Sequence, residues 1–175
     1  MKKIIFFFLL FFISSNSYAN NNIVYLDIQY IIDNSDLGLS YKKIVKSLQD
    51  KIKIEINSKQ KIIKEKEIDI NNKKNILKKD ELNKNLIELD EMVKNYKNYR
   101  NDSAKKIIEE KKKYSSRILE ILNPLLTKFV DSNNIVLVLE KKNILVGAKS
   151  LDITENILIM LNEETKKKKL LDEIN

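Results

Sequence analysis

The sequence contains no cysteine, no histidine and no tryptophan, and it has one proline and two glycines in 175 residues. Without cysteine the chain has no disulfide and no thiolate nucleophile, and without histidine it lacks the commonest general base and an imidazole metal ligand. Serine hydroxyls are present, but no histidine is available to activate them. Gly38 and Gly147 stand outside any glycine-rich phosphate-binding pattern. We therefore predict a protein that is not an enzyme and that has no cofactor or metal.

The first residues have the layout of a cleavable export signal. Lys2 and Lys3 precede an apolar run from Ile4 to Ile13, and a segment of small residues follows and ends at Ala19. The apolar run is far shorter than the roughly 20 residues that a membrane-spanning helix needs. We predict a signal peptide at 1–19, cleavage near Ala19, and a mature protein that is soluble outside the cytoplasm.

Two long runs with coiled-coil spacing follow. Apolar residues recur in steps of three and four between charged residues, which is typical of a coiled-coil seam. The first seam comprises Tyr41, Val45, Leu48, Ile52, Ile56, Ile62 or Ile63, and Ile70. The second starts at Leu86 and comprises Leu89, Val93, Tyr96, Ala104, Ile107, Tyr114, Ile118, Ile121 or Leu122, and Leu125. Residues 71–85 between them are mostly polar, so we predict an antiparallel helical hairpin at 41–131 that turns within 71–85.

Positive charge is concentrated in this hairpin. The segment Tyr41–Ile118 has 23 basic and 13 acidic side chains. The simpler interpretation is a solvated helix face, and the sharper one is an electrostatic lining that meets anionic clients or lipid headgroups. Nucleic acid is disfavoured by export and by the few tyrosines, of which at least two fall on the seam and are better explained by packing. The side chains that are candidates for attracting clients or other anions to the arm are Lys73, Lys74, Arg100, Lys105, Lys106, Lys111, Lys112 and Lys113.

Short apolar stretches at both ends of the hairpin predict a small β-containing base at 20–40 and 132–162. Ile23–Leu26 reads as a strand that pairs with Ile135–Leu139, and Ile144–Ala148 reads as a third strand across a turn. Three short strands bury little area and leave open edges. We therefore expect a homo-oligomer whose copies close their strands into one barrel. The candidate assembly residues are Val24, Leu26, Ile135, Val136, Leu137, Val138, Leu139 and Leu145.

Helix boundaries in the base are indicated by polar residues. Asp27 is expected to end the first strand and cap a short helix at Ile28–Asn34, an interpretation that we prefer to a catalytic carboxylate. Ser35 or Asp36 is expected to cap the long helix that follows. Pro124 should kink the returning helix near the base.

The C-terminal region starts with another candidate cap. Asp152, followed by Glu155, resembles a capping box that opens a last amphipathic helix ending near Leu161. The lysine-rich residues 163–175 are expected to fray.

Together these segments resemble the Skp (OmpH) family of periplasmic chaperones. The resemblance rests on the following residues: Ile23-Val24-Tyr25-Leu26-Asp27, Ile31-Ile32, Ser35, Ile135 to Leu139, Leu145-Val146 and Leu151-Asp152-Ile153-Thr154-Glu155. It implies a trimer with a central barrel and three helical hairpins that surround a cavity as tentacles. It also implies that the protein holds unfolded outer-membrane proteins in the periplasm without ATP. Some members are associated with lipopolysaccharide, but no binding residues carry over.

The expected fold class is thus α+β, mainly α: a long antiparallel helical hairpin, or coiled-coil tentacle, projecting from a small β-barrel base that three strands per chain form on oligomerisation. The expected function is an ATP-independent periplasmic holdase for unfolded outer-membrane proteins. The alternatives are an exported structural coiled-coil spacer and a module that binds anionic lipid or lipopolysaccharide.

Overall fold

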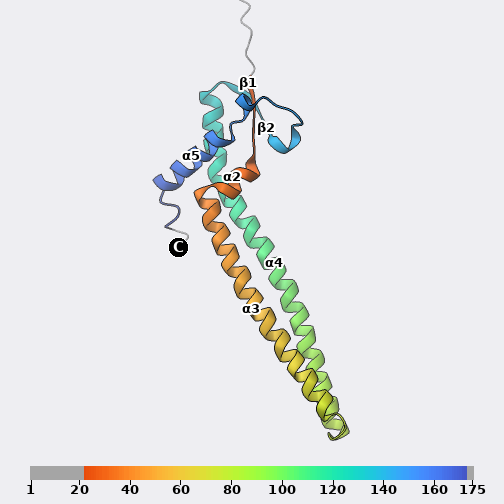
Figure 1. Cartoon of the computed structure of the whole chain (residues 1–175). Helices are drawn as coiled ribbons and strands as arrows, with labels where there is room; N and C mark the ends of the chain where they lie inside the picture. Colours follow the sequence, from red (N-terminus) through yellow and green to blue (C-terminus); the bar gives the residue numbers. More distant parts are fainter. Residues whose placement is uncertain (1–21, 173–175) are drawn as a thin grey trace, which may run out of the picture.

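A long two-helix arm stands on a small base in the computed structural model, which describes residues 22–172 (Figure 1). The arm consists of α3 (Asp36–Lys73) and α4 (Lys79–Ser132), which lie side by side. At 1.5 Å per residue the two helices measure roughly 57 and 81 Å. The predicted hairpin is therefore confirmed. The predicted signal peptide at 1–19 lies outside the described residues, and no helix within residues 22–172 is both long and apolar enough to cross a membrane.

The hairpin turns between Lys73 and Lys79, inside the predicted segment 71–85. The N–H groups of Ile76 and Leu77 both donate to the Lys73 carbonyl, at 2.9 and 3.0 Å, which satisfies one of the free carbonyls at the end of α3. Asp80 and Glu81 occupy the first turn of α4, where the helix dipole favours negative charge. The turn thus forms without glycine or proline.

The base contains a two-stranded parallel sheet of β1 (Asn22–Leu26) and β2 (Ile135–Glu140). Ile23 pairs with Leu137, and Leu26 pairs with Glu140. This confirms the predicted pairing between the first strand and the segment that follows the hairpin. Parallel strands need a long crossover connection, and here the complete arm lies between them.

The predicted third strand at Ile144–Ala148 is wrong. After β2 the chain forms short 3-10 helices, η2 (Lys141–Asn143) and η3 (Lys149–Leu151), with a loop between them. The chain then returns to the other edge of β1, where the Ile153 N–H donates to the Tyr25 carbonyl at 2.9 Å. Because η2 turns the backbone out of the sheet direction, Ile144–Ala148 cannot run beside β2.

Asp27 and Ser35 cap successive helices, as predicted. The Asp27 carboxylate accepts from the Tyr30 N–H at 2.8 Å and starts α2 (Ile28–Asn34). Ser35, and not Asp36, caps α3, because its hydroxyl accepts from the Gly38 N–H at 3.1 Å. A Cβ at Gly38 would lie 1.8 Å from the Ile32 carbonyl oxygen, so only glycine permits this close approach of α2 and α3.

Pro124 lies inside α4, which continues past it to Ser132. The base-proximal turns of α4 leave the line that the helix follows along α3 (Figure 1). Such a bend is expected for a helix with an internal proline, because the ring removes one hydrogen bond and collides with the preceding turn.

The core lies in the base and joins segments from both ends of the chain. Its buried residues come from β1, α2, the start of α3, the root part of α4, α5 (Thr154–Lys167) and the residues on either side of α5. They are Val24, Leu26, Ile31, Leu37, Ile118, Leu122, Ile153, Ile157, Leu158, Leu161 and Leu170. Residues 163–172 differ from the expected frayed tail, and the last three residues of that prediction lie outside the described residues. The described part of this segment extends α5 beyond Leu161 and buries Thr165 and Leu170, because the apolar residues among the lysines reach the root of the arm.

Asp152 joins η2, η3 and α5, but not through the capping box that the sequence predicts. Helix α5 begins at Thr154, and the Asp152 carboxylate accepts from the Thr154 N–H at 3.0 Å, from the Thr154 hydroxyl, and from Lys141 Nζ at 2.9 Å. Burial raises the pKa of Asp152, but the hydrogen bonds from Thr154 and Lys141 outweigh it and hold the pKa below its usual value. The same contact raises the pKa of Lys141.

We predict that Asp152→Asn lowers the free energy of unfolding by about 1–2 kcal/mol at neutral pH, because a charged hydrogen-bond acceptor is lost. The carboxylate of Asp152 stabilises the fold above its ordinary pKa of 3.8, and this contribution is lost as the pH falls through the lower folded-state pKa. The difference between wild type and variant should therefore shrink below about pH 4. Denaturation midpoints at fixed protein concentration measure this difference in stability. Glu155→Gln, which changes an exposed side chain, is the control. An equal difference at neutral and acid pH would contradict the prediction.

Candidate functional site

The apolar contact between α3 and α4 becomes sparse toward the tip of the arm. At the root, Ile118 and Leu122 are almost completely buried, and Val45 and Ile52 continue the contact along α3. Beyond Ile52, Ile70 is the next buried side chain of α3. Elements with few buried apolar contacts open locally at low free energy. The far half of the arm is therefore the more deformable half.

The seam follows the predicted spacing at its root and departs from it farther out. Ile63 lies in the seam, whereas the alternative, Ile62, is half exposed. Ser103 is buried and Ala104 is exposed, so the predicted position was one residue too late. Leu86, the predicted start of the second seam, is also exposed. An apolar pattern could not find a polar seam residue such as Ser103.

Lys66 occupies the gap in the seam between Ile63 and Ile70. Its ammonium group donates to Asn85 Oδ1 at 2.8 Å and to Glu88 Oε2 at 2.7 Å, and 22% of its side chain is exposed. A lysine that joins two side chains of the opposite helix fixes the register of the helices where apolar packing is thin. The sequence gives no signal that sets Lys66 apart from the other lysines of the arm, because its role depends on the register of the opposite helix.

Tyr99 forms a second polar tie across the arm. Its hydroxyl donates to Glu55, and Lys59 lies over its ring at 5.0 Å from the centroid. The hydrogen bond to the Glu55 carboxylate raises the pKa of Tyr99. These contacts join exposed groups, so they add little stability and leave the arm able to bend.

Tyr41 and Tyr114 stack at the root of the arm, with ring centroids 4.2 Å apart and ring planes 12° from parallel. Burial, followed by a hydrogen bond to Glu110, raises the pKa of Tyr114. Both tyrosines lie on the predicted seam, which confirms that they serve in packing. The stacked rings fill the space between α3 and α4 at this level.

The eight basic side chains singled out from the sequence are all exposed, but they do not form one cluster. Lys73 and Lys74 lie at the tip, and Lys73 pairs with Asp69 at 2.7 Å. Arg100 lies over the Tyr96 ring at 5.7 Å from the centroid. The remaining five, distributed along α4 toward the root, are Lys105, Lys106, Lys111, Lys112 and Lys113. The charge is therefore a diffuse lining of the arm.

The arm also exposes isoleucines that the sequence analysis did not single out. Ile54 and Ile68 lie two heptads apart on α3, and Ile87 and Ile108 lie three heptads apart on α4. Each is more than half exposed. Their spacing, which is visible in the sequence, could have identified them. The outer faces of the arm therefore combine isolated apolar side chains with lysines.

A second exposed apolar surface lies on the base, and we name it the base patch. It comprises seven side chains on β1, on β2 and in the segment after β2: Ile23, Val136, Leu137, Leu139, Leu145, Val146 and Leu151. Four of the predicted assembly residues belong to it, namely Val136, Leu137, Leu139 and Leu145. The other four predicted assembly residues contribute to the core. Val24 and Leu26 are buried in it, and Ile135 and Val138 are half-buried against it.

Comparison with known proteins gives one family and one fold. Residues 22–161 match the family model described as outer membrane protein (OmpH-like). A crystal structure from Caulobacter crescentus CB15, described as that of an outer membrane chaperone (OmpH-like), superposes with a TM-score of 0.74 at 14% sequence identity. The match covers 83% of this chain and 86% of that chain, and it confirms the fold of the hairpin on its base. The comparison with curated proteins gives no match.

We predict that Lys66→Ala accelerates amide hydrogen exchange in the far half of the arm by about two- to fivefold and leaves exchange in the base unchanged. The reason is that the contacts of Lys66 with Asn85 and Glu88 occupy a position without apolar packing. The exposed neighbour Lys64→Ala removes the same charge and is the matched control. Equal exchange in both variants would show that Lys66 does not brace the arm.

Proposed function

Because the chain belongs to the OmpH-like family, we propose that it is a periplasmic holdase that binds unfolded outer-membrane proteins without ATP. In this proposal the client lies in a cavity between helical arms of several copies and stays soluble until it is assembled in the outer membrane. The single observation that supports it most is the surface of the arm. That surface presents exposed isoleucines among an excess of basic side chains on a loosely packed hairpin.

Such a surface suits a client without fixed structure. Each exposed isoleucine can contribute only a small apolar contact, but many weak contacts from several arms add up because they act on one chain. The excess of basic side chains attracts acidic segments and speeds encounter. The sparse seam beyond Ile52 lets the arm adjust to clients of different size. Release then requires only a partner that folds the client, since folding removes the contacts one by one.

The base patch supports assembly into a closed ring, and we propose a trimer. The outer edge of β2 has no strand partner among residues 22–172, and Val136, Leu137 and Leu139 on that strand are exposed. Exposed strands with apolar side chains pair with further strands unless they are protected. Barrel closure by several copies would cover the edge and the patch together.

Two other functions fit the observations less well. A rigid spacer needs a continuous seam, whereas polar side chains such as Lys66 interrupt this one. A module for anionic lipid or lipopolysaccharide needs a local basic cluster, whereas the basic side chains are spread from the tip to the root of the arm. The holdase proposal accounts for both the interrupted seam, which lets the arm adjust to its client, and the dispersed basic charge, which attracts the client along the arm.

The proposal is tested by dilution of a urea-unfolded outer-membrane barrel protein into buffer with and without the chain that lacks residues 1–19. We expect the chain to suppress light scattering and to form a complex of defined mass. Aggregation that proceeds at the same rate in the presence of the chain would refute the holdase function. Salt provides a second readout, because raising it to about 0.5 M shortens the screening length to a few ångström and should weaken capture several-fold.

We predict that Val136→Asp dissociates the assembly while the helix content by circular dichroism is retained. Val136 is 67% exposed in the single chain, so a carboxylate there costs little within one copy but would be costly in a closed barrel. Ile108→Asp is the matched control, since Ile108 is 66% exposed on the arm. An unchanged mass of the Val136→Asp variant by light scattering would place the assembly surface elsewhere.

A further inference from the structure

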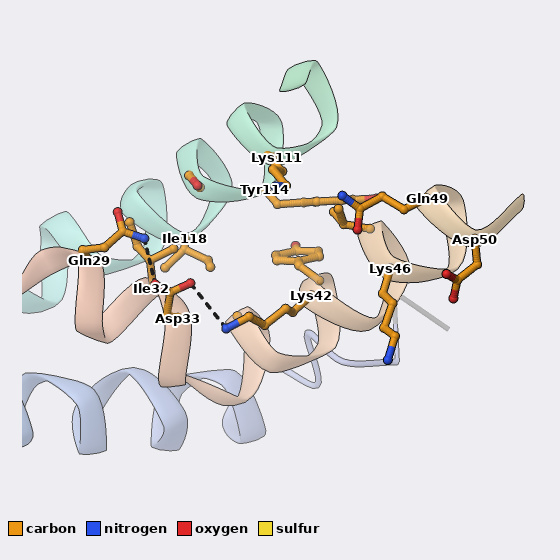
Figure 2. A pocket seen from close by; sticks show the side chains of 14 residues that line it. Gln29, Ile32, Asp33, Lys42, Lys46, Gln49, Asp50, Lys111, Tyr114 and Ile118 are labelled. Carbon is orange, nitrogen blue, oxygen red and sulfur yellow. Dashed lines mark hydrogen bonds and ion pairs between the residues drawn. The ribbon is translucent and has the colours of Figure 1, made fainter. Parts of the chain in front are cut away.

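A groove of about 690 Å³ lies at the root of the arm, where α2, α3 and α4 meet (Figure 2). Its size falls in the range of about 300–1,000 Å³ that is common for ligand sites. Two features of the sequence create it. Gly38 allows α2 to lie against the first turn of α3, and the stacked Tyr41 and Tyr114 form the adjoining part of the lining between α3 and α4.

The inner surface of the groove is apolar and aromatic. Ile32 from α2, Val45 from α3 and Ile118 from α4 line it together with the two tyrosines. A ring that enters the groove can therefore contact the stacked pair, and contacts between aromatic rings add stabilisation beyond the area that they bury.

The rim of the groove provides both acidic and basic side chains. Asp33 is already satisfied, because Gln29 donates to it at 2.9 Å and Lys42 pairs with it at 3.7 Å. Within residues 22–172, Lys46 and Lys111 form no ion pair.

The rest of the rim is polar but not strongly acidic. Asp50 is the remaining carboxylate of the rim, so the unpaired groups include two ammonium groups against one carboxylate. The Gln49 amide, which lies near Tyr114 at the far end of the groove from Gln29, can bond to a peptide group (Figure 2).

We propose that this root groove binds an extended segment of the client polypeptide in which an aromatic residue stands beside a carboxylate. The aromatic ring packs on Tyr41 and Tyr114, the carboxylate pairs with Lys46 or Lys111, and Gln49 bonds to the backbone of the segment. The inference rests on the proposed holdase function and adds a defined anchor to the diffuse contacts of the arm. A neutral apolar ligand would leave both ammonium groups unused, which is why we choose an acidic aromatic segment as the occupant.

The test uses the chain without residues 1–19 and a blocked ten-residue peptide that has Glu-Trp-Glu between glycine and serine residues. The protein contains no tryptophan, so the fluorescence of the peptide reports binding alone. We expect saturable binding, and weaker binding of the matched Lys-Trp-Lys peptide. Reversal of one rim charge by Lys46→Glu should raise the Kd about tenfold, as expected for loss of a charged contact.

Lys43→Glu is the matched control, because it changes the net charge equally on the same helix but lies outside the groove lining. Ser115→Phe fills the groove without a change of charge, and it should abolish peptide binding while the mass and circular dichroism stay as in the wild type. Absence of peptide binding to the wild type, or equal weakening by Lys46→Glu and Lys43→Glu, would overturn the proposal. Loss of the oligomeric mass in Ser115→Phe would also overturn it, because a second copy of the chain would then occupy the groove.

A parallel scattering assay with the unfolded barrel protein separates this inference from the proposed function. If the wild type suppresses aggregation but does not bind the peptide, the root groove fails as an anchor and the holdase function stands. If the wild type does not suppress aggregation, the holdase function is refuted whether or not the peptide binds.

Discussion

The parallel pairing of β1 with β2 is the constraint on which the rest of the structure depends. Parallel neighbours need a long connection, and in this chain the connection is the complete helical arm between Leu26 and Ile135. The pairing therefore brings the ends of α3 and α4 together at one place, where β1, α2 and α5 cover their apolar faces. Without it the two helices would have only their thin mutual seam to hold them, and neither the arm nor the base would have a fixed position.

A gradient of packing follows from this arrangement. The base and the root of the arm contain most of the buried apolar side chains, and the far half of the arm has few of them and is joined there by the polar contacts of Lys66. Stability is thus concentrated where copies of the chain are proposed to assemble, and deformability is concentrated where clients are proposed to bind. The same gradient explains why isoleucines remain exposed on the arm, since a two-helix hairpin has only one buried seam and cannot cover its outer faces.

The root of the arm lies between the well-packed base and the deformable far half of the arm. There the Tyr41–Tyr114 stack lies beside the close contact that Gly38 allows between α2 and α3, and an apolar groove lies between them next to the well-packed base. A binding site on such a support is held more precisely than one on the far arm. An anchor at the root and weak contacts along the arm would together hold a client without fixing its conformation.

By itself the sequence determined the features that depend on residues close in the chain. The seam spacing predicted the hairpin, Asp27 and Ser35 predicted the caps, and the strand-forming stretches at both ends predicted that these two strands pair. Only the tertiary structure decided that Ile144–Ala148 forms a loop, that Ser103 enters the seam, and that Leu170 returns to the core. The groove also depends on the tertiary structure, because Gly38, Tyr41 and Tyr114 form it through contacts between α2, α3 and α4. Periodicity reports which side of a helix is apolar, but contacts between distant segments depend on how those sides meet in space, and no local pattern records that.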